Sequence, residues 1–264
     1  MEKIPKIIFI VPYRNREIEL IHFKVYMSKY ILEDYDEDDY KIFFIHQHDN
    51  RQFNRGAMKN IGFLAMKEKY PDNYKDITFV FNDVDTVPAF KKLINYETKE
   101  GFVKHFYGFT HTLGGIVSII GKDFEKINGF PNYWAWGLED NDLQHRVYKN
   151  NIKIDRSVFF KATNPIIINL DNRPSRIQSK EQPWRSGPNN KEGFNNIKNL
   201  KYEFDKDMIN VFNFTTLVDP KSEHFFNKKK DPRIDFDKNF KPKDSNVNSS
   251  PYISNAQRPM FKLF

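Results

Sequence analysis

Two carboxylates lie two residues apart at the end of an apolar run, in the segment Asn82-Asp83-Val84-Asp85. Alternate side chains of an extended chain point the same way, so Asp83 and Asp85 are expected to face one side. Two such hard oxygen ligands suit Mg²⁺ or Mn²⁺ that bridges the phosphates of a nucleotide. Asn and Asp also favour turns after strands, and an ordinary turn is an equally good interpretation of this short segment taken alone.

Two further segments offer cationic and amide donors. Arg14 and Arg16 could clasp a pyrophosphate or a carboxylate, because a guanidinium donates two parallel hydrogen bonds to such oxyanions. Phe53-Asn54-Arg55 follows a polar loop and opens an expected helix, whose free amides also favour anions. Exposed surface arginines, and a Phe that only packs against the helix start, are the alternatives.

A third segment combines indoles with acids. Trp134-Ala135-Trp136 is followed closely by Glu139 and Asp140. Indole faces pack on the apolar faces of sugar rings, and carboxylates accept hydrogen bonds from sugar hydroxyls. A carboxylate there can also act as general base toward an attacking hydroxyl. The same acids would cap a helix over 143–148, and both roles are compatible.

A sheet with helices between its strands would bring these segments together. The expected helix 17–31 carries apolar residues at broadly helical spacing, namely Ile18, Ile21, Val25, Met27 and Tyr30. The alternation predicts a mostly parallel α/β sheet, in which ligands bind beyond the carboxyl ends of the strands. A later strand over 113–120 is entered through two glycines, which permit close approach of a ligand. The first five expected elements are strand 6–13, helix 17–31, strand 41–46, helix 54–70 and strand 77–81.

Composition narrows the function classes. The 264 residues are 39% hydrophobic and 16% aromatic, which excludes a wholly disordered chain. Cysteine is absent, so neither disulfides nor thiolate metal sites can form. Of the net charge of +7, +5 lies in residues 221–264, and a basic tail is usually solvated, so nucleic acid is not an expected partner. The apolar run 7–11 is too short for a membrane span.

Taken in order, these segments resemble the β-1,4-galactosyltransferase family, which is glycosyltransferase family 7 with the GT-A fold. Each string alone is weak, but the ordered set with family-like spacing over 6–148 is specific, and a weaker similarity continues over 193–205. The matching strings are Val11-Pro12-Tyr13-Arg14-Asn15-Arg16, Phe53-Asn54-Arg55-Gly56-Ala57, Asn60-Ile61-Gly62-Phe63, Asp83-Val84-Asp85, Gly114-Gly115, Asn128-Gly129-Phe130-Pro131-Asn132 and Trp134-Ala135-Trp136-Gly137-Leu138-Glu139-Asp140.

The resemblance implies roles for the matching residues. Asp85 would ligate Mn²⁺ or Mg²⁺, and Trp136 would be a mobile tryptophan that touches donor and acceptor. Glu139 would hold sugar hydroxyls, and Asp140 would be the general base of an inverting transfer to a glycan or glycoprotein acceptor. The UDP-sugar donor would be bound by Pro12, Tyr13, Arg14, Arg16, Phe53, Arg55, Asp83, Val84, Gly114, Gly115 and Trp136.

Three departures from the family pattern concern the metal, the tryptophan segment and the donor. No His lies between His145 and His224, where the family completes its metal site, and Asp171 would be the best substitute ligand. Leu138 stands in place of a family glycine, so less flexibility is expected beside Trp136. Thr112 stands in place of a bulky Tyr that favours galactose, so both UDP-Gal and UDP-GalNAc are candidate donors.

We expect a catalytic domain over 1–220 and a basic, flexible or loosely docked tail over 221–264. Residues 1–110 would bind the nucleotide and 111–220 the acceptor, with a loop over about 171–196 closing on the donor. The family's Golgi members carry an anchor, a stem and disulfides. Because none of these features is recognised in this sequence, the protein is expected to be cytoplasmic. Its Asn-, Lys- and Ile-rich usage suggests a viral or microbial source. A carbohydrate- or nucleotide-sugar-binding protein with weakened catalysis is the alternative, because the metal-site His is missing.

Overall fold

Strand β1 (Ile7–Tyr13) is buried along its whole length because its side chains alternate between two separate cores. Ile8 and Ile10 belong to one core, whereas Ile7, Phe9 and Val11 belong to the other. A strand buried on both faces reads as a continuous apolar run, which is how the sequence predicted it. The sheet therefore has to be covered by other elements on both sides.

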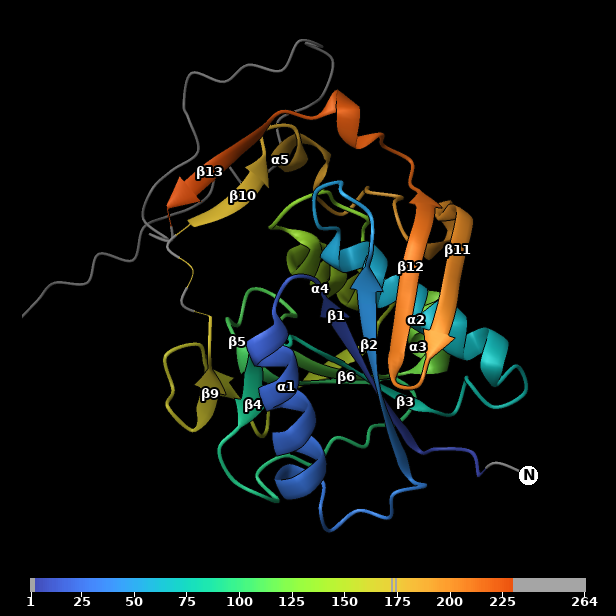
Figure 1. The fold of residues 1–264 in the computed structure, drawn as a ribbon, viewed down its shortest axis with the longest axis vertical. Coiled ribbons are helices and arrows are strands. Elements are labelled where there is room, and N and C mark those ends of the chain that lie inside the picture. Colours follow the sequence, from blue (N-terminus) through green and yellow to red (C-terminus); the bar gives the residue numbers. More distant parts are fainter. Residues whose placement is uncertain (1–2, 172, 174, 230–264) are drawn as a thin grey trace, which may run out of the picture.

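The computed structural model describes residues 3–171, 173 and 175–229, and they form a central sheet with helices on both faces (Figure 1). The remaining elements are α1 (Glu17–Tyr26), a π-helix (Met27–Ile31), β2 (Tyr40–Gln47), α2 (Arg55–Lys69), β3 (Thr78–Asn82), β4 (Thr86–Pro88), β5 (Phe102–Gly108), β6 (Ile116–Ile120), α3 (Gly121–Lys126), α4 (Glu139–Lys149), β7 (Lys153–Asp155), β8 (Phe160–Lys161), β9 (Ile167–Asn169), β10 (Ser175–Ser179), α5 (Gln182–Arg185), a 3-10 helix (Phe194–Asn196), β11 (Lys198–Asp205), β12 (Met208–Thr215), a second 3-10 helix (Pro220–Ser222) and β13 (Phe225–Lys229).

The nine-stranded sheet has the order β11-β12-β2-β1-β3-β6-β5-β7, and β8 also pairs with β5. β1 is parallel to both neighbours, β2 and β3, and the pairs β12 with β2, β5 with β7 and β5 with β8 are parallel as well. The other pairs, β11 with β12, β3 with β6 and β5 with β6, are antiparallel. This mixed sheet with a parallel centre confirms the predicted α/β class.

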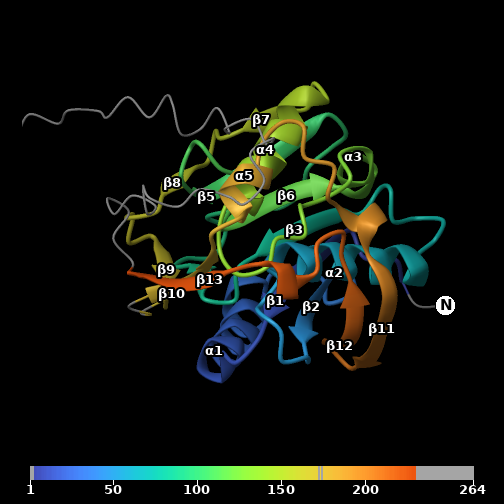
Figure 2. The same ribbon diagram turned by 90° about the horizontal axis from the view of Figure 1, so that it is seen from above.

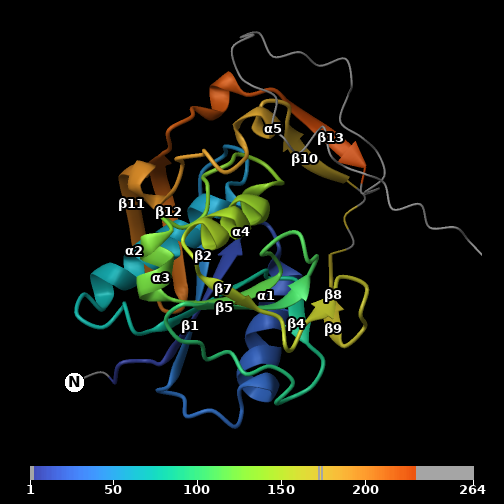
Figure 3. The ribbon, with the colours of Figure 1, turned by 180° about the vertical axis from the view of Figure 1, so that it is seen from behind.

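Helices cover the two faces unequally. α1 contributes Phe23 to one core, whereas α2, α3 and α4 contribute to the other. Figure 3 shows α2, α3 and α4 on the side of the sheet that faces away from α1. Of the five residues that indicated helical spacing in 17–31, Ile18, Ile21 and Val25 are exposed, whereas Met27 is buried and Tyr30 is partly buried. The buried face is formed by Phe23, which the predicted stripe did not include, together with Met27 and Ile31 in the π-helix.

The later part of the chain differs from the predicted boundaries. The expected strand 113–120 begins only at Ile116, and the expected helix 143–148 begins already at Glu139. Phe225–Lys229, assigned from sequence to the tail, forms β13 and pairs antiparallel with β10 (Figure 2). The rest of that tail, 230–264, lies outside the described residues. Every helix in the described ranges is too short or too polar to cross a bilayer.

Candidate active site

Arg55 begins helix α2 at the carboxyl edge of the sheet. The Asn54 side chain caps this helix by accepting a hydrogen bond from the Ala57 amide at 2.9 Å, an arrangement that contributes about 1 kcal/mol. A Cβ atom on Gly56 would lie 2.0 Å from the Pro131 carbonyl oxygen, so only glycine lets the first turn of α2 approach the segment before Trp134 this closely. The capped helix therefore holds the Arg55 guanidinium between two parts of the chain.

The Arg55 guanidinium joins the two acidic segments that the sequence analysis singled out. It lies 3.1 Å from the Asp83 carboxylate, 3.0 Å from the Asp140 carboxylate, and its Nε donates to Glu139 at 2.6 Å. Burial acts to lower the pKa of Arg55, but the charges of Asp83, Glu139 and Asp140 outweigh it and raise the pKa well above its usual range. Acids from the end of β3 and from the start of α4 thus face each other across one cation.

Two glycines let these acids come close to the entry of β6. Gly115 has a φ of +72°, and its carbonyl oxygen accepts a hydrogen bond from the Asp83 amide at 3.1 Å. A Cβ atom on Gly114 would lie 2.4 Å from an Asp140 carboxylate oxygen. The Leu113 amide donates to the Asp140 carbonyl oxygen at 3.0 Å. The Gly-Gly segment therefore packs directly against the predicted general base.

His105 supports the backbone of this glycine segment. Its Nε2 lies 2.9 Å from the Tyr107 carbonyl oxygen and 3.1 Å from that of Gly114, so this nitrogen carries the proton. Its Nδ1 accepts a hydrogen bond from Arg156 at 3.0 Å. Burial and the Arg156 charge lower the pKa of His105 from 6.5 to about 4. A neutral ring therefore supports the backbone beside Asp140.

A fifth residue, Lys59, contacts two of these acids, Asp83 and Asp140, and was not predicted. It follows Arg55 by one helical turn, is 2% exposed, and its ammonium donates to Asp140 at 3.3 Å. The spacing of four residues, which puts both cations on one helix face, was the available signal. We call Arg55, Lys59, Asp83, Glu139 and Asp140 the Arg55 cluster.

Asp85 belongs to a second charged group. β4 and β9 pair so that Thr86 lies opposite Asn169, and the Leu170 amide donates to the Asp85 carbonyl oxygen at 2.8 Å. This pairing brings Asp171, the predicted substitute ligand, beside Asp85. Arg16 bridges the two carboxylates, at 3.2 Å from Asp85 and 3.8 Å from Asp171.

Arginines of the following segment complete this second group. Arg173 lies 2.8 Å from Asp171 and 4.0 Å from Asp85, and Arg176 forms an ion pair with Asp171. Neither arginine was predicted, because their partners are distant in sequence and no local pattern marks them. We call Arg16, Asp85, Asp171, Arg173 and Arg176 the Asp171 cluster.

The pKa values of the two carboxylates in this cluster are shifted in opposite directions. Burial raises the pKa of Asp85, and the neighbouring charge of Asp83 adds to it. Burial of Asp171 also acts to raise its pKa, but hydrogen bonds from Arg173 and Arg176 outweigh it and hold the pKa well below its usual range. The arginines therefore favour the ionised form of Asp171, whereas a further cation that approached Asp85 would favour its ionised form.

The donor set around Asp85 fits a divalent metal held jointly with a substrate. Within the described ranges, no three His, Asp or Glu side chains lie close enough together to hold a metal ion by themselves. Mg²⁺ is commonly bound by one or two carboxylates and substrate phosphates, and Asp85 and Asp171 supply two carboxylates that already share one cation, the Arg16 guanidinium. Asp171 thus offers a hard oxygen donor where the family pattern has a histidine.

The other residues predicted to bind the UDP-sugar belong to neither charged cluster. Arg14 donates to the Arg51 carbonyl oxygen rather than joining Arg16 in a fork. Tyr13 is buried with its ring 5.2 Å from that of His46. Pro12 and Val84 are also buried, and Phe53 packs against the core on the α2 side.

The two tryptophans have separate roles. Trp134 is fully buried, stacks on Phe214 at 5.4 Å and donates to the Val218 carbonyl oxygen at 3.0 Å. The expectation that both indoles form a sugar platform is therefore wrong for Trp134, which is part of the core. Trp136 is partly exposed, with the Arg176 guanidinium 4.4 Å from the centre of its ring.

The segment predicted to be a long loop, 171–196, contains β10, α5 and a 3-10 helix. Its Ile177 carbonyl oxygen accepts from the Trp136 amide at 2.9 Å. Ser186 and the Gly187 amide donate to Asp142 at 2.8 and 2.9 Å, which fastens the segment to α4. The segment is thus tied both to Trp136 and to the helix that begins with Glu139.

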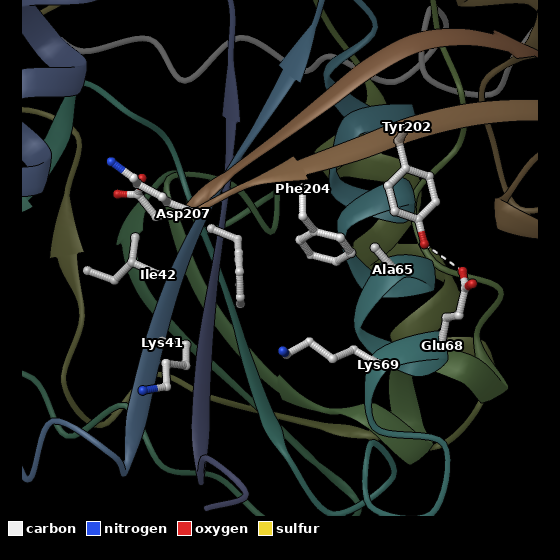
Figure 4. Close-up of a pocket in the computed structure, with 10 residues that line it drawn as sticks. Lys41, Ile42, Ala65, Glu68, Lys69, Tyr202, Phe204 and Asp207 are labelled. Carbon is white, nitrogen blue, oxygen red and sulfur yellow. Dashed lines mark hydrogen bonds between the residues drawn. The ribbon is translucent and has the colours of Figure 1, made fainter. Parts of the chain in front are cut away.

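A groove of about 650 Å³ lies elsewhere, between α2, the start of β2 and the β11–β12 hairpin (Figure 4). Ala65, Tyr202 and Phe204 are among its lining residues, and the Tyr202 hydroxyl bonds to Glu68. All of its lining residues differ from those of the two charged clusters. The groove is therefore separate from the candidate site.

Two family models match the chain. One describes the N-terminal region of glycosyl transferase group 7 and matches residues 2–97. The other describes the N-terminal domain of galactosyltransferase and matches residues 100–166. The two matches include the whole Arg55 cluster, and both end before Asp171.

Curated relatives and solved structures agree with the family models. The chain is 34% identical over 164 residues to human beta-1,4-galactosyltransferase 4, a match that covers 57% of this chain and 45% of the relative. It is 31% identical over 160 residues to the xylosylprotein 4-beta-galactosyltransferase of Caenorhabditis elegans, covering 57% and 53%. The matched segments thus span about half the length of these relatives.

Similar folds occur in solved structures of a Drosophila enzyme. The catalytic domain of Drosophila beta-1,4-galactosyltransferase 7 in complex with xylobiose matches with a TM-score of 0.67 at 22% identity, covering 83% of this chain and 97% of the other. A mutant of that enzyme in complex with manganese, UDP-Gal and xylobiose matches with a TM-score of 0.63 at 20% identity. This likeness establishes a shared GT-A fold.

Proposed function

Because the chain belongs to the β-1,4-galactosyltransferase family, glycosyltransferase family 7, we propose that it is an inverting glycosyltransferase. It moves galactose or N-acetylgalactosamine from a UDP-sugar to a hydroxyl group of a glycan or glycosylated acceptor. The observation that carries this proposal is the meeting of Asp83, Glu139 and Asp140 around Arg55. Acids from the nucleotide half and from the acceptor half thereby border one site at the carboxyl edge of the sheet.

Asp140 is the general base in this proposal. Its carboxylate takes the proton of the acceptor hydroxyl while the hydroxyl oxygen attacks the anomeric carbon. The bond from that carbon to the β-phosphate oxygen of UDP breaks on the opposite face, so the configuration is inverted. Glu139 and the backbone at Gly114 and Gly115 border the space for the sugar, and Trp136 covers it.

Asp85 and Asp171 hold the metal in this proposal, either Mn²⁺ or Mg²⁺. When bound, the metal neutralises charge on the departing diphosphate. Arg16 contributes a guanidinium at the same place, because it already spans both carboxylates. A UDP-Gal complex with manganese is known for the Drosophila relative.

A donor screen by UDP release tests the proposal. Each UDP-sugar is offered with Mn²⁺, with Mg²⁺ and with a chelator, in the presence and absence of xylosides and N-acetylglucosaminides as acceptors. We expect release from UDP-Gal or UDP-GalNAc that depends on metal and is stimulated by acceptor. Saturable binding of UDP-sugars without release under any metal would favour the alternative, a binding protein of the same fold.

A further inference from the structure

Lys59 is a buried cation that the proposed reaction does not yet use. It lies on the inner face of α2, is 2% exposed, and its ammonium sits 4.4 Å from the centre of the Phe130 ring. An ammonium group in such a place costs free energy unless it is paired with carboxylates and hydrogen-bonded. Its partners therefore determine what it does.

Those partners are one acid from each half of the site. The Lys59 ammonium donates to Asp140 Oδ1 at 3.3 Å and lies 4.0 Å from Asp83 Oδ1. That Asp83 oxygen is buried and accepts no hydrogen bond from any described residue. Lys59 thus lies within ion-pair distance of a carboxylate oxygen that has no hydrogen-bond partner among the described residues.

The Asp140 carboxylate is held at both of its oxygens by different cations. Oδ2 lies 3.0 Å from Arg55, whereas Oδ1 bonds to Lys59. The Gly114 backbone closes a further side, since a Cβ atom there would lie 2.4 Å from Oδ2. Arg55 alone would leave Oδ1 free to rotate, so Lys59 supplies the second point that fixes the plane of the carboxylate.

We propose that Lys59 is a positioning residue for the transfer reaction: from inside the core it fixes Asp140 in line with the acceptor hydroxyl and sets the separation of Asp140 from Asp83. This inference rests on the proposed function. Because Lys59 is enclosed beneath the two carboxylates, it acts through Asp140 rather than on the substrates. Its removal is therefore expected to affect turnover more than donor binding.

Lys59→Met tests this role, because methionine has a similar length and tolerates burial. We expect kcat to fall on the order of 10²-fold, the effect of a small misplacement of a reacting group. The donor KM should change less than about threefold, because Arg55 and Phe53 at the start of the same helix remain in place. Lys67→Met is the matched control: it removes a lysine two turns further along α2 whose partner is Glu125, and its kcat should equal that of the wild type.

Two kinetic results would overturn the proposal. One is a kcat for Lys59→Met within about threefold of the wild type. The other is a rise in donor KM as large as the fall in kcat, which would mean that the variant simply loosens the start of α2. Both results are measurable with saturating acceptor in the UDP-release assay.

A double-variant cycle in urea unfolding tests the contact without turnover. Lys59→Met, Asp140→Asn and the double variant are compared with the wild type. We expect the double variant to lose less stability than the two single variants together, because each single change already breaks the same pair. Strict additivity would overturn the proposal. If the wild type released UDP from no donor, the proposed function would fail, whereas this cycle would still report whether Lys59 holds Asp140.

Discussion

The two charged clusters of the site are built in different ways. The Arg55 cluster is assembled from the end of β3 and the starts of α2 and α4, all of which are anchored in the core. The Asp171 cluster draws Asp171, Arg173 and Arg176 from the chain around β9 and β10, which form small two-stranded pairings outside the main sheet. The first cluster is set by regular elements, and the second by short pairings and arginine bridges.

This difference coincides with the extent of the family matches. Both models together reach residue 166, so the Arg55 cluster lies inside them and Asp171 beyond them. The residues proposed as base and donor site therefore lie within the family matches, whereas Asp171, the proposed metal ligand, lies beyond them. We therefore expect substitutions in the Arg55 cluster to reduce the transfer rate most. Substitutions in the Asp171 cluster should change the dependence of the reaction on metal.

The largest expected effect is at the Arg55 cluster. Asp140→Asn keeps the size of the side chain but removes the base, and we expect transfer to fall by about 10²- to 10⁴-fold. UDP-sugar binding, measured by calorimetry, should stay nearly unchanged. A variant that transfers at the wild-type rate would show that the base lies elsewhere and would remove the main contrast between the clusters.

The Asp171 cluster should respond through the metal. In Asp171→Ala, the Mn²⁺ concentration that gives half-maximal UDP release should rise at least about tenfold, because a carboxylate ligand and its arginine contacts are lost. Asp155→Ala, a change in β7 of a side chain that accepts a hydrogen bond from the Ser157 amide, serves as the control. The same Mn²⁺ dependence in the Asp171 variant and the control would mean that Asp171 has a structural role only.

Thr112, which precedes the Gly114 segment, is expected to influence the choice between UDP-Gal and UDP-GalNAc. Thr112→Tyr places a bulky ring where a small side chain now stands, and we expect it to lower the preference for UDP-GalNAc relative to UDP-Gal by about tenfold or more. Competition between the two donors in one assay measures this ratio. An identical ratio in both proteins would discard pocket size as the determinant.

The smallest expected effect concerns the support of the Arg55 cluster by His105. The pKa of His105 is lowered to about 4 in the folded protein, so the unfolded chain binds the proton first as the pH falls from 6.5. This residue should therefore reduce the free energy of unfolding of the wild type as the pH falls from 6.5 to 4, by at most about 3 kcal/mol.

His105→Gln removes the titrating ring, so the difference in unfolding free energy between the variant and the wild type should narrow toward low pH. Urea unfolding at several pH values measures this difference. A gap that stays constant between pH 4 and 6.5 would contradict the assignment of a buried, neutral ring.

Much of the regular half of the site could be predicted from the sequence. The strand-edge rule placed Asp83 and the start of α2 together, and the ordered motifs added Glu139 and Asp140. Burial of Trp134 was hidden, because a Trp-x-Trp string does not reveal which ring enters the core. Burial of Lys59 was not predicted, because a lysine within a helix is expected to be solvated. Arg173 and Arg176 depend on contacts between short, distant pairings that no local pattern encodes.

The most direct test of the whole account is a crystal structure with UDP-Gal and Mn²⁺ bound to Asp140→Asn. We expect the diphosphate beside Asp85 and Asp171, with the sugar beside Glu139 and residue 140. Nucleotide bound away from both clusters, or a site that stays empty of nucleotide under every metal, would contradict it.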